Sequence, residues 1–182
     1  MTRCYPLIPC DSDKNIIQNK YSVNAFAFRE AAILSIEFQV NDPLQEIHWP
    51  EKQKIERQDF LWESTCFEAF ISTPNKTKYF ELNLSPSLAW NLYRFNDYRT
   101  PNDMPPIRML EPALINFDVK EQRISAEIDL NTLKLADQEI TLGLTAVIKT
   151  AESLDYLAVH HPKSEADFHD SMGWAIRLLP DA

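Results

Sequence analysis

Two glutamates and an asparagine stand at alternating positions in two short segments that read as neighbouring strands. Glu68 lies within residues 65–71, and Glu81 and Asn83 lie within residues 79–84. Side chains two positions apart share one face of a strand, so all three point away from the apolar stripe of their segment. If the segments pair, they form a polar patch on one sheet face, here called the polar floor. Fixed carboxylates and amides of this kind hold the hydroxyl groups of a ligand.

Aromatic and cationic side chains lie close to this patch in the sequence. Trp62 precedes Glu68 by six residues, and Tyr93 and Arg94 lie in the next segment. Aromatic faces pack on the apolar C–H surface of a sugar ring, so Trp62 and Tyr93 are expected to stack on a ligand while Arg94 orients the carboxylates. The alternative is structural: the rings fill a core, and Arg94 forms an ion pair with Glu68 or Glu81.

Three of the four histidines lie in one segment near the C-terminal end, where they are expected to close the rim of the site. These are His160, His161 and His169. Adjacent residues of a strand point to opposite faces, so His160 and His161 do not easily share a metal ion, and no metal-binding spacing is present. We predict no metal site, and local hydrogen bonding is the alternative role for these side chains.

Other chemistries have weaker support. Glu68 and Glu81 could serve as the paired carboxylates of a glycoside-acting enzyme. The histidines with Met104, Met109 or Met172 could ligate haem. The two glycines cannot build a nucleotide-binding loop, and Cys66 lacks a nucleophile motif. We therefore predict a non-catalytic protein without a cofactor, which binds a small molecule, possibly a sugar. Haem binding, glycoside chemistry and a purely structural or interaction role stay open as alternatives.

Alternation of apolar and polar residues runs through most of the chain and predicts an all-β fold, an antiparallel immunoglobulin-like or jelly-roll β-sandwich. A short helix is expected near 133–137, and long loops at 41–60 and 96–112. The whole chain, 1–182, is expected to form one domain. The strands are expected at 21–28, 32–40, 65–71, 79–84, 123–130, 140–148, 154–160 and 174–179.

Composition narrows the class of partner. The 182 residues carry a formal net charge of −9 and include three scattered cysteines. Such a chain repels phosphate backbones, so nucleic acid and anionic membranes are poor partners. It has no secretory signal and no apolar run of about 20 residues, the length of a membrane helix. We expect a cytoplasmic protein of undetermined oligomeric state.

The sequence resembles the DOMON-like family of small bacterial proteins in three blocks: "LWESTCFEAFI" (61–71), "YFELNLSPSLAWNLYRFNDYR" (79–99) and "HHPKSEADFH" (160–169). The resemblance implies a single β-sandwich, and related domains bind haem or sugars. By analogy with family 9 carbohydrate-binding modules, Trp62 would be the first aromatic wall, with Glu68 and Asn83 as polar strand residues. Glu81 stands where those modules have a basic residue, and Phe168 and His169 stand nearest to their second aromatic wall.

Overall fold

A computed structural model describes residues 3–10 and 20–181 and shows an all-β chain, as predicted. Residues 1–2, 11–19 and 182 of the predicted domain lie outside the described residues. The strands are β1 (Arg3–Pro9), β2 (Ser22–Glu30), β3 (Ile33–Asn41), β4 (Glu56–Arg57), β5 (Cys66–Ser72), β6 (Tyr79–Leu84), β7 (Ala89–Phe95), β8 (Leu114–Lys120), β9 (Arg123–Asp129), β10 (Ile140–Lys149), β11 (Leu154–Ala158) and β12 (Ile176–Leu178). Two short 3₁₀ turns, η1 (Leu61–Glu63) and η2 (Ser171–Gly173), complete the elements.

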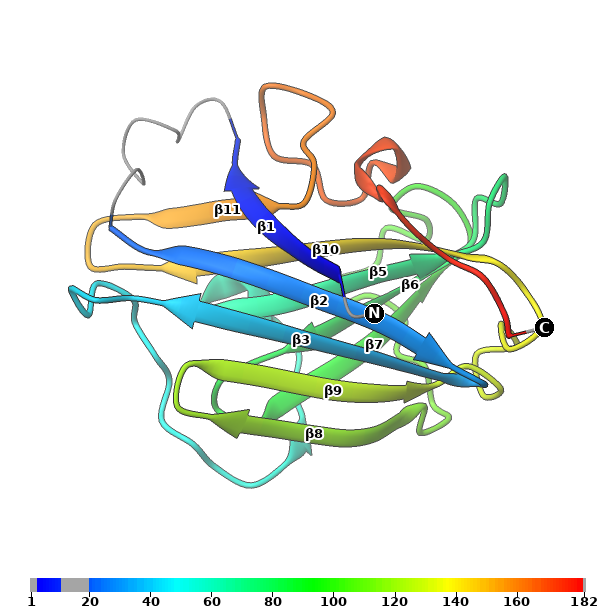
Figure 1. Ribbon diagram of the computed structural model, residues 1–182, viewed down its shortest axis with the longest axis horizontal. Helices are drawn as coiled ribbons and strands as arrows, with labels where there is room; N and C mark the ends of the chain where they lie inside the picture. Colours follow the sequence, from blue (N-terminus) through cyan, green and yellow to red (C-terminus); the bar gives the residue numbers. More distant parts are fainter. Residues whose placement is uncertain (1–2, 11–19, 182) are drawn as a thin grey trace.

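The strands form one curled sheet in the order β4-β7-β6-β5-β10-β11-β1-β2-β3-β9-β8, with β12 added beside β10. Among the described strand pairs, β4 and β7 run parallel and the others are antiparallel. β1 pairs with β11 near one of its ends and with β2 along its length, which joins the two halves of the sheet. In Figure 1, β2, β3, β9 and β8 pass in front of β5, β6 and β7.

One apolar core joins the inner faces of these two halves. Leu34, Ile36 and Phe38 of β3 belong to the same buried cluster as Phe67 and Ala69 of β5, and each of these five side chains is at most 2% exposed. The alternation of apolar and polar residues decides which face of each strand turns inward. In β5 the polar-face residues are buried as well. The outer face of this half must therefore be covered by other parts of the chain.

Three expectations need correction. Residues 133–137 form turns instead of a helix, and Leu133 and Leu135 contribute to the core from that irregular segment. The strand predicted at 174–179 is limited to β12, and Trp174 lies in the loop before it. The strand predicted at 154–160 ends at Ala158. No helix in the described part of the chain is long and apolar enough to cross a membrane.

Candidate functional site

The strand register brings the polar floor together as predicted. Glu68 of β5 lies directly opposite Asn83 of β6, and Glu81 lies opposite Phe70. On the other side of β5, Glu68 lies opposite Thr145 of β10, whose hydroxyl donates a hydrogen bond to Glu68 Oε2 at 3.1 Å. The polar floor therefore occupies the outer face of the central strands, opposite the main core.

Loops cover this face and leave a cavity of about 180 Å³ above it. The covering segments are the residues around η1, the segment 99–106 after β7, and the segment 166–169 before η2. The cavity lining is Trp62, Glu68, Phe70, Glu81, Phe95, Arg99, Pro101, Asn102, Asp103, Met104, Pro106, Val147, Tyr156, Ala166, Phe168 and His169. It combines aromatic rings with two buried carboxyl groups, the mixture typical of a small-molecule site.

Glu81 has one occupied and one unoccupied carboxyl oxygen. Asn83 Nδ2 donates to Glu81 Oε1 at 2.7 Å, whereas Oε2 is buried and accepts no hydrogen bond. His169 Nε2 lies 3.7 Å from Oε2, too far for a direct hydrogen bond. A buried carboxyl oxygen without a donor is costly, so it marks a place where a further polar group would be stabilised.

Hydrogen bonding fixes which nitrogen of His169 faces Glu81. The hydroxyl of Tyr79 accepts the backbone N–H of Arg99 at 3.2 Å and lies 2.7 Å from His169 Nδ1. Because the hydroxyl already has a donor, its own proton is best used toward Nδ1. The neutral imidazole then carries its proton on Nε2, the nitrogen that faces Glu81 Oε2. The pair thus offers one acceptor and one donor.

Burial controls the charges on the cavity floor. It raises the pKa of Glu81 to about 7, against hydrogen bonding from Asn83 and the charge of Arg99. It raises the pKa of Glu68 well above its ordinary value, and the neighbouring charge of Glu81 adds to the effect. Burial also lowers the pKa of His169 to about 4. Near neutral pH, His169 is therefore uncharged and Glu81 is partly ionised, and the raised pKa of Glu68 favours its protonated form.

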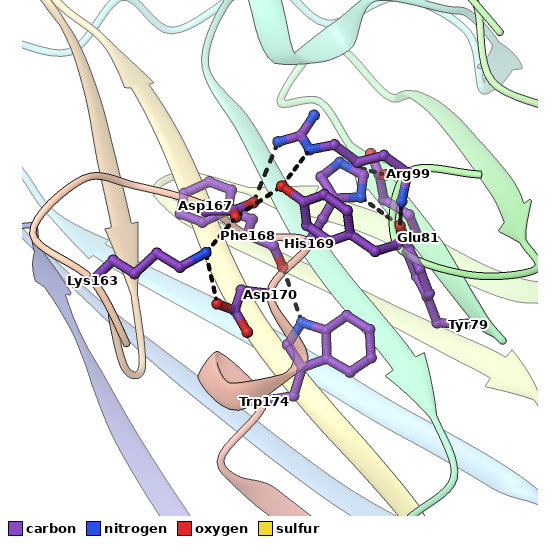
Figure 2. A network of polar contacts seen from close by, with 10 residues as sticks. Tyr79, Glu81, Arg99, Lys163, Asp167, Phe168, His169, Asp170 and Trp174 are labelled. Atoms are coloured by element: carbon purple, nitrogen blue, oxygen red, sulfur yellow. Dashed lines mark hydrogen bonds and ion pairs between the residues drawn. The ribbon is translucent and has the colours of Figure 1, made fainter. Parts of the chain in front are cut away.

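A polar network connects the loop after β7 with the loop before η2, as Figure 2 shows. Arg99 Nη2 lies 3.4 Å from Asp167 Oδ1, and the Tyr98 hydroxyl donates to Asp167 Oδ2 at 3.0 Å. Lys163 Nζ lies 3.2 Å from Asp167 Oδ2 and 2.9 Å from Asp170 Oδ2. We call these five side chains the loop clamp. It holds Arg99 and the segment that carries His169 beside the cavity.

Trp174 supports the segment 166–169 from below. Its indole Nε1 donates to the backbone carbonyl of Phe168 at 2.9 Å, and its ring stacks against Phe70. The ring occupies the space above Gly143, where a Cβ atom would overlap Trp174 Cδ1. Glycine at position 143 therefore leaves the space that the indole of Trp174 occupies against the sheet. Sequence reasoning placed Trp174 in a strand and missed this contact.

Trp62 is held at the cavity by buried partners. Its ring meets Tyr93 edge to face at 5.9 Å, and Tyr93 is fully buried with its hydroxyl donating to Asp59 Oδ1 at 2.9 Å. Asp59 also accepts from Asn91 and Arg108, which anchors the chain just before η1. Hydrogen bonding from Arg108 keeps the pKa of Asp59 below its usual range. Tyr93 is thus a support for Trp62 and does not line the cavity.

The predicted residues separate into three groups. Trp62, Glu68, Glu81 and His169 line the cavity. Asn83 and Tyr93 are fully buried behind it and position its lining. The third group lies outside the cavity lining: Arg94, His160 and His161.

The expected role of Arg94 was wrong because it alternates with Tyr93 and Phe95 and so lies on the opposite face of β7. Arg99 is the cavity's arginine instead. His160 is exposed, and His161 Nε2 donates to the carbonyl of Ile8 at 2.9 Å. No group of three or more His, Cys, Asp or Glu side chains suited to hold a metal occurs among residues 3–10 and 20–181.

Comparison with protein-family models and with curated protein sequences gives no match. Among solved structures, the chain is similar to the crystal structure of a "putative carbohydrate-binding protein" from Bacteroides uniformis. The TM-score is 0.68 at 8% sequence identity, and the match covers 98% of this chain and 86% of the other. At this identity the likeness shows a shared fold and nothing about shared residues.

Proposed function

We propose that this protein binds a carbohydrate, or a similar polyhydroxylated small molecule, in the cavity above the polar floor, without catalysing a reaction. The observation that carries the proposal is the Glu81–His169 pair in the cavity lining. Oε2 of Glu81 is buried without a hydrogen-bond donor, and Nε2 of His169 lies 3.7 Å from it. A ligand hydroxyl that reaches this pair donates to Oε2 and accepts from Nε2, after a small rotation of either side chain.

The aromatic part of the lining suits the apolar C–H face of a sugar ring. Trp62, Phe168 and Tyr156 line the same cavity as the two carboxyl groups. Their rings offer surfaces for the C–H face of a pyranose ring, while the polar floor takes its hydroxyls. The structural neighbour from Bacteroides uniformis adds weak support, since its description names carbohydrate and its fold covers nearly all of this chain.

The finer classification is part of the same proposal. We assign the chain to the DOMON-like proteins on the three sequence blocks that carry the resemblance, and its curled sheet to the immunoglobulin-like or jelly-roll sandwiches. The packing of the two halves around one core supports the sandwich assignment. The position of Trp62 at the cavity, with Phe168 and His169 also in its lining, supports the analogy with carbohydrate-binding modules.

A glycoside-acting enzyme is the second candidate, favoured by the raised pKa of Glu81, which resembles that of a general acid. Glycosidase carboxyls flank the scissile bond. Glu68 and Glu81 instead lie on adjacent strands of one sheet face, so both approach a ligand from the same side. This arrangement supports recognition over hydrolysis.

Haem does not fit the histidine at the cavity. His169 Nδ1 is hydrogen-bonded to Tyr79, and Nε2 faces Glu81 Oε2. For either ring nitrogen to ligate a haem iron, His169 would have to give up its hydrogen bond to Tyr79 or turn away from Glu81. A haem titration that produces no Soret band is the expected result.

Thermal unfolding with a panel of neutral hexoses, pentoses and disaccharides tests the function. A ligand at about 100 times its Kd stabilises the folded state by about 2.7 kcal/mol, which is readily measured. We expect a dose-dependent rise in Tm with at least one sugar, lost in Trp62→Ala and unchanged in Trp49→Ala relative to its own sugar-free baseline. Release of product from a matching glycoside panel would replace the binding function with the enzymatic one.

A further inference from the structure

The cavity holds more acidic groups than its cationic side chains can neutralise. Glu68 and Glu81 are 3% and 5% exposed, and both contribute to the lining. Arg99, the one arginine among the described residues of that lining, is already engaged by Asp167 and the Tyr98 hydroxyl. Burial lowers the pKa of His169 to about 4, so this side chain is neutral near pH 7. The cavity lining that the structure describes includes no lysine.

The geometry points to a ligand that carries a protonated amine, which binds against Glu68 and Glu81, so that the site takes an amino sugar or another polyhydroxylated amine. This inference rests on the proposed function, because it names the chemical class of ligand for the same cavity. It goes further in predicting that a neutral sugar of the same shape binds more weakly.

An ammonium group can supply the hydrogen-bond donors that the carboxyl oxygens of Glu68 and Glu81 lack. It has three donors and no acceptor, whereas a hydroxyl donates once. Glu81 Oε2 accepts no hydrogen bond, and Glu68 Oε2 accepts a hydrogen bond from the Thr145 hydroxyl. Two carboxylates on adjacent strands repel each other when both ionise, and a cation between them removes that repulsion. A neutral hydroxyl leaves the repulsion in place.

The aromatic rings favour the same charge. Phe70 and Phe95 line the cavity beside the carboxyls, together with Trp62 and Phe168. The face of an aromatic ring attracts a cation within about 6 Å of its centroid, more strongly when water is excluded. The aromatic rings and the carboxyl groups of the lining thus both favour a positively charged ligand.

Proton release on binding distinguishes a charged amine from a neutral sugar of the same shape. In the unliganded protein, burial raises the pKa of both Glu68 and Glu81 and so favours the protonated carboxyl over the ionised carboxylate at each residue. A bound cation favours the ionised carboxyls and lowers both pKa values. Binding of an amine therefore releases protons to the buffer. Binding of a neutral sugar leaves these pKa values close to where they were.

Isothermal titration calorimetry on the full chain tests the inference with three matched trios. The probes are D-glucosamine, D-galactosamine and D-mannosamine, each beside its parent hexose and its N-acetyl derivative, at a pH where the amines are charged. Two buffers of different ionisation enthalpy give the number of protons released. We expect at least one amine to bind about tenfold or more tightly than its parent hexose, with proton release.

Two variants locate the effect. Glu68→Gln and Glu81→Gln keep the shape of a neutral carboxyl and should fold, which far-UV circular dichroism checks. Each is expected to remove most of the preference for the amine and to reduce proton release. The matched control is Glu121→Gln, in the exposed turn between β8 and β9, which should leave both unchanged.

The outcomes separate the two proposals. A hexose that binds as tightly as its amine overturns the inference and leaves the proposed function standing. Preference for the amine that persists in both glutamine variants also overturns it, because the amine then binds elsewhere. If no member of any trio binds, the inference fails and the proposed carbohydrate function fails with it for these sugars.

Discussion

Oε2 of Glu81 and Nε2 of His169 lie 3.7 Å apart in the wall of the cavity, close enough to attract but too far to form a hydrogen bond. Each group is fixed from its other end, Glu81 by Asn83 and His169 by Tyr79. A ring nitrogen that donates and a carboxyl oxygen that accepts therefore face each other with capacity for another polar group. A ligand hydroxyl that reaches this pair can donate to Glu81 Oε2 and accept from His169 Nε2.

Replacing Glu81 with glutamine should change how stability depends on pH. The pKa of Glu81 is about 7 in the folded protein against 4.5 ordinarily, so the folded state holds a proton that the unfolded chain has already lost. Its contribution to stability is fully present below about pH 4.5 and is lost as the pH rises through about 7. Relative to wild type, Glu81→Gln should gain roughly 1–3 kcal/mol of unfolding free energy between pH 4.5 and 8.

Urea denaturation at several pH values measures this difference. Glu121→Gln serves as the control, since that exposed glutamate lies away from the cavity and its variant should follow wild type across the range. A constant difference between Glu81→Gln and wild type at every pH would contradict the assignment of Glu81 as the titrating group.

The imidazole of His169 should titrate far below the usual range. Burial lowers its pKa to about 4 from an ordinary value of 6.5, so the folded state stays neutral while the unfolded chain takes up a proton. This contribution to stability is present above pH 6.5 and is lost as the pH falls through about 4, opposite in sign to that of Glu81. NMR titration of the His169 ring protons, assigned with His169→Gln, checks the value; a midpoint near 6.5 would contradict it.

A methyl group at position 143 should displace Trp174. In Gly143→Ala the new Cβ overlaps Trp174 Cδ1, and the indole must move away from the sheet and from the Phe168 carbonyl. We expect a loss of about 1–3 kcal/mol in unfolding free energy, the usual cost of overpacking. A double-mutant cycle with Trp174→Leu measures the coupling. Additive effects in that cycle would show that the two residues do not compete for space.

Asp167→Asn should loosen the loop clamp. It weakens the ion pairs with Arg99 and Lys163 and the hydrogen bond from Tyr98. Because Arg99 and Lys163 are exposed to solvent, the expected loss of stability is small, about 1 kcal/mol or less.

Amide hydrogen exchange is the sharper readout for this variant. Faster exchange should be confined to residues 97–106 and 163–170, with β5 and β6 unaffected. Asp137→Asn, in an exposed turn, is the matched control. Unchanged exchange in both loops would show that the network contributes nothing to holding them.

The sequence predicted the polar floor because it depends on two simple rules. Alternation put Glu68, Glu81 and Asn83 on one face of their strands, and adjacency in the chain made β5 and β6 neighbours, which the register confirms. The same alternation explains why Arg94 does not reach the polar floor. Arg94 directly follows Tyr93 in β7, so its side chain points to the opposite face of the sheet.

Most of the cover of the cavity could not be predicted in the same way, although His169 was expected at the rim and lies in the lining. Arg99, Phe168 and His169 reach the polar floor from loops, whose paths follow no period. The positions of these loops depend on contacts between distant residues, such as Arg99 with Asp167 or Trp174 with Gly143. Trp174 itself was misplaced because an apolar residue before a strand reads like part of that strand.

The central claim is that ligand binds in the cavity above the polar floor, beside Trp62. The chain has four tryptophans, so its indole N–H groups give at most four well-dispersed signals in a ¹⁵N-correlated NMR spectrum. On titration with the tightest sugar or amino sugar, we predict that the Trp62 signal shifts most, while Trp49 and Trp90, which pack against the main core, stay unchanged. A saturating shift at Trp49 or Trp90 with Trp62 unmoved would contradict the account.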